Sequence, residues 1–392
     1  MTKMSTATLH WGGCTEARFL RDFWQRKPLL LRQAFPGFQP LLSRTQLFAL
    51  AASEDVESRL LQREGRRWQL DHGPFARKQL PAVEQPNWTL LVQGVNLHVD
   101  AAGELLRQFR FIPDARLDDL MISWASKGGG VGPHQDAYDV FLLQASGRRR
   151  WRIGPVHDAA LQPGKPVKLL ARFTPEEDLV LEPGDMLYLP PGWGHDGIAA
   201  SGDCMTYSIG FRAPPQGELL KEVLWQMAEA QHGGDLYRDP PLRPQATPAQ
   251  LPPAMVKFAR DAFARLKPDA AWFENMLGLY LTTPKPQVWF EGAEAAASAL
   301  RRACRQSGCR LDRRSKMLYT ATSVFINGEA VEAALASSAL LRALADQQAL
   351  DAAQVQSAQP AEVALLADWC ALGWLQVGDD ALTPAARKPA QA

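Results

Sequence analysis

The stretch from Met121 to Arg212 constrains the fold most strongly, because glycine and proline turns divide it into short apolar segments. Segments of this length, punctuated at this spacing, are typical of β-strands in a sandwich or jelly roll rather than of helices. We therefore expect an antiparallel β-structure here. The turns that carry this prediction lie at residues 128–130, 146–147, 154–155, 183–184 and 190–192.

Helical periodicity dominates the chain beyond Arg212. The 392 residues exceed the usual size of one hydrophobic core, so we expect more than one domain. Near the N-terminus we expect a helix over 15–26 and then a strand at Pro28–Leu31. Asn327-Gly328 is typical of a hairpin turn, and helices on both sides of it predict a winged-helix-like module. The tail after Leu382 is expected to be disordered. The later helices are expected at 218–231, 253–265, 269–281, 293–306, 331–347 and 360–371.

The overall charge and the cysteines exclude several classes of protein. A formal net charge of +1 argues against a general polyanion binder, and no apolar run has the length of a membrane span. Residues 1–13 lack the apolar core of a secretory signal, so we expect a cytoplasmic protein without a disulfide framework. Cys304 and Cys309 have no second Cys/His pair nearby to complete a zinc site, so we expect them to be structural.

Two His-x-Asp motifs offer candidate metal ligands, His98-Val99-Asp100 and His134-Gln135-Asp136. Asp100 precedes a helical segment and is interpreted as a helix N-cap. His134 and Asp136 follow a glycine-rich turn, and residues two apart on a strand point to one face. His195, at the end of a turn–strand–turn stretch, is the candidate third ligand. Two imidazoles and one carboxylate leave three coordination positions open, which suits non-haem iron(II).

Arg149 is the candidate for holding a co-substrate. In the segment after the Ser146-Gly147 turn, Trp151 and Ile153 share one strand face, and alternation places Arg149 on that inward face. A buried guanidinium needs a carboxylate partner, and 2-oxoglutarate, the usual co-substrate of such an iron site, carries one. A structural Arg–Asp pair is the alternative. Ser123 is expected to offer a hydroxyl to the same carboxylate.

Several stretches of the chain together resemble the bacterial JmjC-type cupin ribosomal oxygenases. The resemblance covers about residues 10–215 and rests on segments 23–32, 120–123, 128–139, 147–151 and 183–195. It implies a mixed α+β fold: a double-stranded β-helix (the cupin or JmjC jelly roll), then a helical dimerisation region and a C-terminal winged-helix-like domain. The corresponding boundaries are 1–214 with a core at 95–212, then 215–286, then 287–392.

The same resemblance implies an activity, namely iron(II)-, 2-oxoglutarate- and O2-dependent hydroxylation of a protein side chain. The implied target is the β-carbon of an arginine in a large-subunit ribosomal protein, the sixteenth. By position, His134, Asp136 and His195 match the family's iron ligands, Arg149 matches the partner of the distal carboxylate, and Ser123 matches a co-substrate contact. We expect a homodimer with no membrane partner and no direct reading of nucleic acid. The outward-facing side chains expected to solvate the barrel, with contact to ribosomal RNA left open, are Arg148, Arg150 and Arg152.

Two other functions remain open on the sequence alone. The same iron site would serve a histidyl hydroxylase or a lysyl demethylase of this superfamily, because the groove selects the substrate and the fold does not. A non-catalytic jelly roll that binds a partner or nucleic acid is the other alternative. A missing ligand or a missing inward cation would favour it, and neither is missing. Tyr138 and Asp139, just past the ligands, are expected either to line the peptide groove or to pack only.

Overall fold

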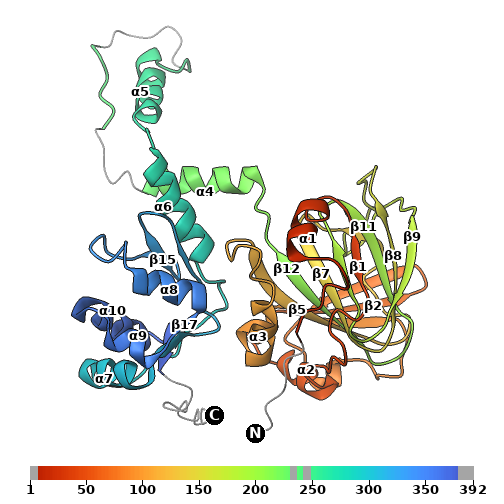
Figure 1. Cartoon of the computed structure of the whole chain (residues 1–392). Coiled ribbons are helices and arrows are strands. Elements are labelled where there is room, and N and C mark those ends of the chain that lie inside the picture. Colours follow the sequence, from red (N-terminus) through yellow and green to blue (C-terminus); the bar gives the residue numbers. More distant parts are fainter. Residues whose placement is uncertain (1–7, 230–235, 242–248, 378–392) are drawn as a thin grey trace. The chain divides into compact units, whose positions relative to one another are not determined.

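The computed structural model describes residues 8–229, 236–241 and 249–377, and its chain divides into two compact units. The first unit ends at Ala213 but also includes Lys285–Phe290, and the second comprises Pro214–Pro284 and the chain from Glu291. Figure 1 shows the β-rich first unit and the helix-rich second. Within the described ranges, no helix has both the length and the apolar character needed to cross a bilayer.

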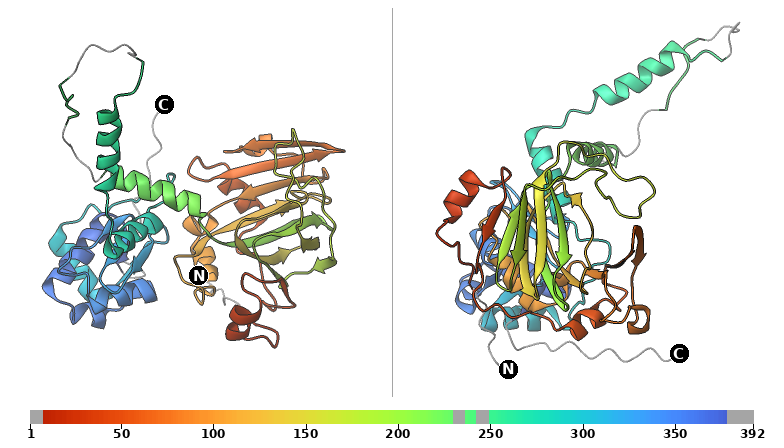
Figure 2. Two further views of the ribbon diagram at one scale, coloured as in Figure 1. Left: turned by 90° about the horizontal axis from the view of Figure 1, so that it is seen from above. Right: turned by 90° about the vertical axis from the view of Figure 1, so that its right-hand side faces the viewer.

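An eight-stranded antiparallel sheet forms one wall of the first unit (Figures 1 and 2). Its order is β1-β10-β7-β12-β5-β4-β2-β3, so sheet neighbours are often distant in sequence, as in a jelly roll. The strands are β1 (Leu29–Leu31), β2 (Ser58–Glu64), β3 (Arg67–His72), β4 (Trp88–Val92), β5 (Leu117–Ala125), β7 (Asp139–Ser146), β10 (Met186–Leu189) and β12 (Cys204–Phe211).

A four-stranded sheet in the order β6-β11-β8-β9 forms the opposite wall. Apolar side chains from the two walls form one buried cluster, in which Leu142 and Leu187 of the large sheet meet Trp151 and Ile153 of the small one. The inner faces of the sheets therefore enclose the barrel interior, and the expected jelly roll in a mixed α+β fold is confirmed. The strands of this sheet are β6 (His134–Gln135), β8 (Arg149–Pro155), β9 (Glu177–Leu181) and β11 (Trp193–Ala199).

The outer face of the large sheet is covered by an aromatic core that includes Phe19, Phe141 and Tyr188. Asp139 is fully buried within this layer, where it accepts hydrogen bonds from Tyr188 (2.6 Å) and Arg116 (3.0 Å). It therefore packs and does not line an open groove. The helices of this unit are α1 (Glu16–Asp22), α2 (Arg44–Leu50) and α3 (Asp100–Arg107), with 3-10 turns at Arg77–Gln79 and Val95–Leu97.

Three helices begin the second unit, α4 (Gln216–Glu229), α5 (Pro253–Ala264) and α6 (Ala270–Thr282). The Tyr280 hydroxyl donates a hydrogen bond to Glu218, which joins α6 to α4. Neither α4 nor α5 has a fully buried residue, and several of their apolar side chains are exposed. The large apolar side chains exposed on these two helices are Leu220, Leu224, Trp225, Met255, Val256 and Phe263.

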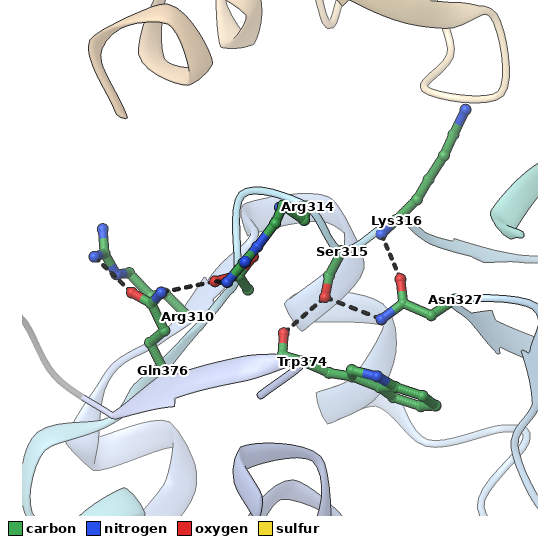
Figure 3. A network of polar contacts seen from close by, with 8 residues as sticks. Arg310, Arg314, Ser315, Lys316, Asn327, Trp374 and Gln376 are labelled. Atoms are coloured by element: carbon green, nitrogen blue, oxygen red, sulfur yellow. Dashed lines mark hydrogen bonds and ion pairs between the residues drawn. The ribbon is translucent and has the colours of Figure 1, made fainter. Parts of the chain in front are cut away.

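The rest of the second unit packs helices against two three-stranded sheets, β17-β13-β18 and β14-β15-β16. Asn327 links them: its amide donates to the Ser315 hydroxyl (3.0 Å), which donates to the Trp374 carbonyl (2.9 Å; Figure 3). The elements are α7 (Ala297–Ser307), β13 (Cys309–Leu311), β14 (Met317–Tyr319), β15 (Val324–Ile326), β16 (Glu329–Ala330), α8 (Ala339–Gln347), β17 (Ala349–Leu350), α9 (Ala352–Gln356), α10 (Pro360–Ala371) and β18 (Leu375–Val377).

Most of the expected elements are present, with differences at helix ends. The helix expected at 15–26 ends at Asp22, and the helix expected at 293–306 begins at Ala297. The helix expected at 331–347 begins only at Ala339, because the Ser338 side chain caps it by accepting from the Leu341 amide (3.1 Å). The helix after His98 begins at Asp100 itself, so Asp100 is its first residue and Val99 occupies the N-cap. The end of the helix expected at 218–231 and the tail after Leu382 lie outside the described residues.

The turn and the cysteines of the second unit agree with expectation. Asn327 and Gly328 both have positive φ, +49° and +86°, as a two-residue hairpin turn between β15 and β16 requires. Cys304 and Cys309 are buried free thiols, and Cys304 Sγ lies 3.6 Å from Cys370 Sγ. Their burial supports a packing role.

Candidate metal and co-substrate site

Strand pairing brings the three candidate metal ligands together. His134 on β6 lies directly opposite His195 on β11, and Asp136 follows β6 by one residue. One ligand atom from each side chain lies within 4.8 Å of the others, and Asp136 Oδ2 is 3.5 Å from His195 Nε2. These are the separations expected of donors that surround one small cation. Within the described part of the chain, no other group of three or more His, Cys, Asp or Glu residues converges in this way.

Backbone carbonyls orient both imidazole rings. His134 Nδ1 lies 2.8 Å from the Gly132 carbonyl oxygen, and His195 Nδ1 lies 3.2 Å from that of Trp193. A ring that donates through Nδ1 carries its lone pair on Nε2, which then faces the centre of the site. The glycine-rich turn supplies one of these carbonyls because Gly132 adopts a φ of +85°, where a side chain would be strained.

The electrostatics of the ligand set also favour a cation. Burial, aided by the charge of His134, lowers the pKa of His195 well below its ordinary value, so the ring is neutral and able to ligate. Burial raises the pKa of Asp136, although His134, Tyr138 and Arg59 oppose the shift. A divalent ion among these atoms would favour the carboxylate form. The donor set therefore fits iron(II).

Arg149 points into the barrel, as strand alternation predicted. Its side chain is 3 % exposed, and its guanidinium carbon lies 5.7 Å from the Trp151 ring centroid. Its Nε and Nη2 atoms have no hydrogen-bond partner among the described residues. Because unpaired buried donors are costly, this guanidinium fits a bound carboxylate better than a structural Arg–Asp pair. The neighbouring outward arginines differ, since Arg150 pairs with Asp178 and Arg152 with Asp196.

Ser123 belongs to a polar row on the inner face of the large sheet. It lies opposite Thr206, which lies opposite Gln144. The Ser123 hydroxyl donates to the Thr206 carbonyl (3.3 Å), and the Thr206 hydroxyl donates to Gln144 Oε1 (3.0 Å). Sequence reasoning found Ser123 but missed the other two, because the apolar runs around them concealed which face they occupy.

Packing between the two walls places this polar row beside Arg149. Ala199 lies opposite Arg149 in the small sheet and packs on Ala125 and Cys204 of the large sheet. Those two residues are two positions from Ser123 and Thr206 on the same strand faces. An anion held by Arg149 would therefore meet hydroxyl groups across the barrel.

Trp151 connects the guanidinium to the metal ligands. Its ring centroid lies 5.8 Å from that of His195, and its ring covers Gly197. A Cβ at Gly197 would lie 2.4 Å from the Trp151 ring, so only glycine permits this packing. The small residue and the large ring together close the barrel between the ligand set and Arg149.

Further charged groups surround the ligands on the side of Tyr138, whose side chain is exposed. Burial and the negative charges of Asp136 and Asp119 raise the pKa of Tyr138, while Arg59 opposes them. The phenol therefore feels the charge of two carboxylates, one belonging to the ligand set and one on β5. Asp119 and Arg59 were not identified from the sequence, where neither stands in a recognisable motif.

Comparisons with known proteins agree with this geometry. Residues 104–219 match the JmjC domain family, and residues 265–376 match the ROXA-like winged helix family. The chain is 38% identical over 284 residues to the ribosomal protein uL16 3-hydroxylase of Escherichia coli, covering 72% of this chain and 74% of that protein. It is 30% identical over 351 residues to a probable ribosomal oxygenase of Haemophilus influenzae, covering 85% and 86% of the two chains.

Solved structures of a ribosomal oxygenase also match this chain, over nearly its whole length. The X-ray structure of E. coli YcfD superposes with a TM-score of 0.80 at 34% identity, covering 94% of this chain and 98% of that one. A structure of YcfD, a ribosomal oxygenase, in complex with cobalt and 2-oxoglutarate gives 0.77 at 33% identity, covering 94% and 99%. A bifunctional lysine-specific demethylase and histidyl-hydroxylase of Aedes aegypti is 26% identical, covering 47% of this chain and 31% of that protein.

Proposed function

This chain belongs to the JmjC-type ribosomal oxygenases, and we propose that it hydroxylates the β-carbon of an arginine in ribosomal protein uL16 with iron(II), 2-oxoglutarate and O2. Its 38% identity to the E. coli uL16 3-hydroxylase supports this substrate. The observation that carries the proposal is the pairing of a convergent His-Asp-His set with the unpartnered guanidinium of Arg149 in one barrel. The His-Asp-His set would hold a metal, and the guanidinium of Arg149 would select a dicarboxylate co-substrate.

The proposed roles follow from where each side chain points. His134, Asp136 and His195 would hold iron(II), and a set of three protein ligands would leave room for the co-substrate and oxygen. Arg149 binds the distal carboxylate of 2-oxoglutarate, and Ser123 contributes a hydroxyl from the facing wall. Bound iron(II) and 2-oxoglutarate supply the oxygen-activating chemistry that amino-acid side chains lack.

The protein contributes position and shielding. The carbonyls of Gly132 and Trp193 fix the two imidazoles, so that the ligands need little rearrangement when metal binds. Trp151 and the apolar cluster of Leu142 and Leu187 keep bulk water away from the co-substrate. The charged groups near Tyr138 mark the open side, from which a polypeptide would enter.

The proposal is tested with purified protein, iron(II), 2-oxoglutarate and uL16 isolated from a strain that lacks this gene. We expect succinate to form and one oxygen atom to be added to a single arginine, as located by tandem mass spectrometry. Asp136→Ala protein is the control for uncatalysed oxidation. Oxygen on a histidine, or loss of a methyl group from a lysine, would favour the second candidate, to which the Aedes aegypti relative gives its support. No turnover with any ribosomal protein would leave a binding role.

We also propose that the protein is a cytoplasmic homodimer that pairs through the helical region 215–286. The support is the row of exposed apolar side chains on α4 and α5, since such faces are typical of interfaces. Light scattering should give twice the mass of one chain, and Leu224→Glu together with Phe263→Glu should halve it. The winged-helix-like region, 287–392, has no separate role in this proposal.

A further inference from the structure

The carbonyl that orients the candidate ligand His134 belongs to a glycine, the residue whose backbone is least restrained. The Gly132 oxygen lies 2.8 Å from His134 Nδ1, and Gly132 has a φ of +85°. A glycine has access to more backbone conformations than any other residue, so its peptide groups need outside support to keep one orientation. The direction of the His134 ring therefore depends on what surrounds Gly132.

Two large apolar side chains from separate elements pack on Gly132. A Cβ placed on Gly132 would lie 2.7 Å from Leu169 Cδ2 and 3.0 Å from Trp68 Cζ2, so both side chains lie directly against the glycine backbone. Trp68 is on β3, the edge strand of the large sheet, whereas Leu169 lies in the connection between β8 and β9. The glycine is therefore held between two parts of the barrel that are distant in sequence.

The connection between β8 and β9, residues 156–176, is itself folded, and we call it the strap. Within it the Gln162 amide donates to the Leu169 carbonyl (2.8 Å), and Leu169 is 2% exposed. The Lys165 ammonium donates to the Arg66 carbonyl (2.8 Å), in the turn between β2 and β3. The strap therefore leaves the small sheet and is tied to the hairpin of the large sheet that carries Trp68.

The strap also holds the peptide group that follows Gly132. The amide of Leu170, a buried residue, donates to the Pro133 carbonyl (2.9 Å). Proline has no N–H of its own and a fixed φ, so this bond and the packing on Gly132 restrain a turn that few backbone bonds can reach. Both carbonyls that precede His134 are thus held, the first by the ring and the second by the strap.

Arg63 supports Trp68 from the neighbouring strand. The two residues lie opposite each other in the pairing of β2 with β3, and the Arg63 guanidinium carbon is 5.7 Å from the Trp68 ring centroid. Arg63 Nη2 lies 3.5 Å from the Gly128 carbonyl oxygen, at the other end of the glycine-rich turn. Trp68 is therefore held in place by a residue that also touches this turn.

We propose that Trp68 and Leu169 are positioning residues for His134, which hold the Gly132 carbonyl where it fixes the proton on Nδ1 and turns Nε2 toward the metal. The inference rests on the proposed function in taking His134 as a metal ligand. Both residues act through Gly132 and not on the reacting atoms. Partners that fix a ligating imidazole typically change metal affinity by about 10- to 100-fold when they are lost.

His195 provides an internal comparison for this role. Its ring is oriented by the Trp193 carbonyl (3.2 Å). Trp193 is held by the pairing of β11 with β8, where it lies opposite Pro155. A change at Trp68 that acts through Gly132 should therefore alter His134 and leave His195 as it was, whereas a general loosening of the barrel would alter both rings.

The first test follows the tautomers of the two rings in the metal-free, full-length protein labelled with nitrogen-15 histidine. Two-bond proton–nitrogen NMR spectra at about pH 8, where histidine side chains are ordinarily neutral, show which ring nitrogen carries the proton. The spectrum of His134→Gln identifies the His134 signals. In the wild-type protein we expect the proton on Nδ1 of both His134 and His195.

Trp68→Phe is the decisive variant, because phenylalanine keeps an aromatic ring but is too short to present the Cζ2 edge that touches Gly132. We expect the His134 signals to move toward the average of the two tautomers, while those of His195 stay unchanged. An unchanged His134 signal, or an equal change at His195, would overturn the proposal.

A second measurement reports on metal affinity and uses the strap in place of the hairpin. Isothermal titration with manganese(II) should show binding about 10-fold weaker in Leu169→Ala and nearly restored in Leu169→Met, which refills the contact with Gly132. Leu161→Ala is the matched control, since Leu161 lies in the same strap but is exposed. Wild-type affinity in Leu169→Ala, or equal weakening in Leu161→Ala, would contradict the positioning role.

Failure of this inference can be told apart from failure of the proposed function. Wild-type protein that does not bind manganese(II) would overturn both the ligand role of His134 and its positioning. Normal metal binding by the wild-type protein, with an unchanged His134 tautomer in Trp68→Phe, would overturn the positioning role alone. Oxygen addition to uL16 is measured separately and decides the substrate.

Discussion

His134 and His195 lie directly opposite each other in the pairing of β6 with β11, and their ring centroids are 4.2 Å apart. Neighbouring antiparallel strands hold opposed side chains at this separation without any local strain. The metal site is therefore built on sheet register, and only Asp136 reaches it from beyond the end of a strand.

The carboxylate of Asp136 should be essential for metal binding. We expect Asp136→Ala to weaken binding of iron(II) or manganese(II) by at least about 100-fold, because loss of a direct ligand exceeds the usual effect of an outer-shell change. Isothermal titration calorimetry measures this. Asp178→Ala, an exposed carboxylate on β9, is the control and should bind metal normally. Normal metal affinity in Asp136→Ala would place the site elsewhere.

Arg149 should govern co-substrate affinity and lower the stability of the ligand-free protein. Arg149→Met is expected to weaken 2-oxoglutarate binding by about 2–5 kcal/mol while metal affinity stays the same. The same variant should raise the free energy of unfolding without co-substrate by about 1–3 kcal/mol, because it removes an unpaired buried cation. Competition binding and urea denaturation measure the two effects. In the control Arg150→Met, which removes an exposed, paired arginine, 2-oxoglutarate should bind as before.

Gly197 should tolerate no side chain. A Cβ there lies 2.4 Å from the Trp151 ring, so Gly197→Ala must displace the ring that packs near His195. We expect a loss of about 1–3 kcal/mol in stability, from overpacking, together with weaker metal binding. Gly202→Ala is the control, since a Cβ at that position would have no atom within 4 Å. Equal melting temperatures for the two variants would refute the packing argument.

The metal-free protein should lose stability as the pH falls below 6.5. Burial holds the pKa of His195 well under that value, so the unfolded chain takes up a proton that the folded chain does not. Because the unfolded state then binds more protons, the free energy of unfolding decreases as the pH drops through this range. Urea denaturation across a pH series measures the slope. His195→Asn should make it shallower, and an identical slope in the variant would exclude His195 as its source.

Local periodicity explains which site residues the sequence could identify. Side chains two apart on a strand share a face, so His134 could be assigned with Asp136, and Arg149 could be placed with Trp151. The same reasoning left two roles open for Asp139, lining the peptide groove or packing only, and the structure shows packing: its side chain turns to the outer aromatic core and accepts a hydrogen bond from Tyr188. Asp139 lies on the strand face opposite the metal site. The residues next to it in the sequence do not indicate which face of the strand is the outer one.

The sequence by itself determined the strand-and-turn pattern, the identity of the ligand types and the inward direction of Arg149. Tertiary structure alone decided that His195 stands opposite His134, that Thr206 and Gln144 extend the row of Ser123, and that Trp68 and Leu169 pack on Gly132. The physical reason is that backbone geometry fixes where a side chain points along its own strand. Which strands become neighbours, and in which register, depends on burying apolar faces contributed by the whole chain.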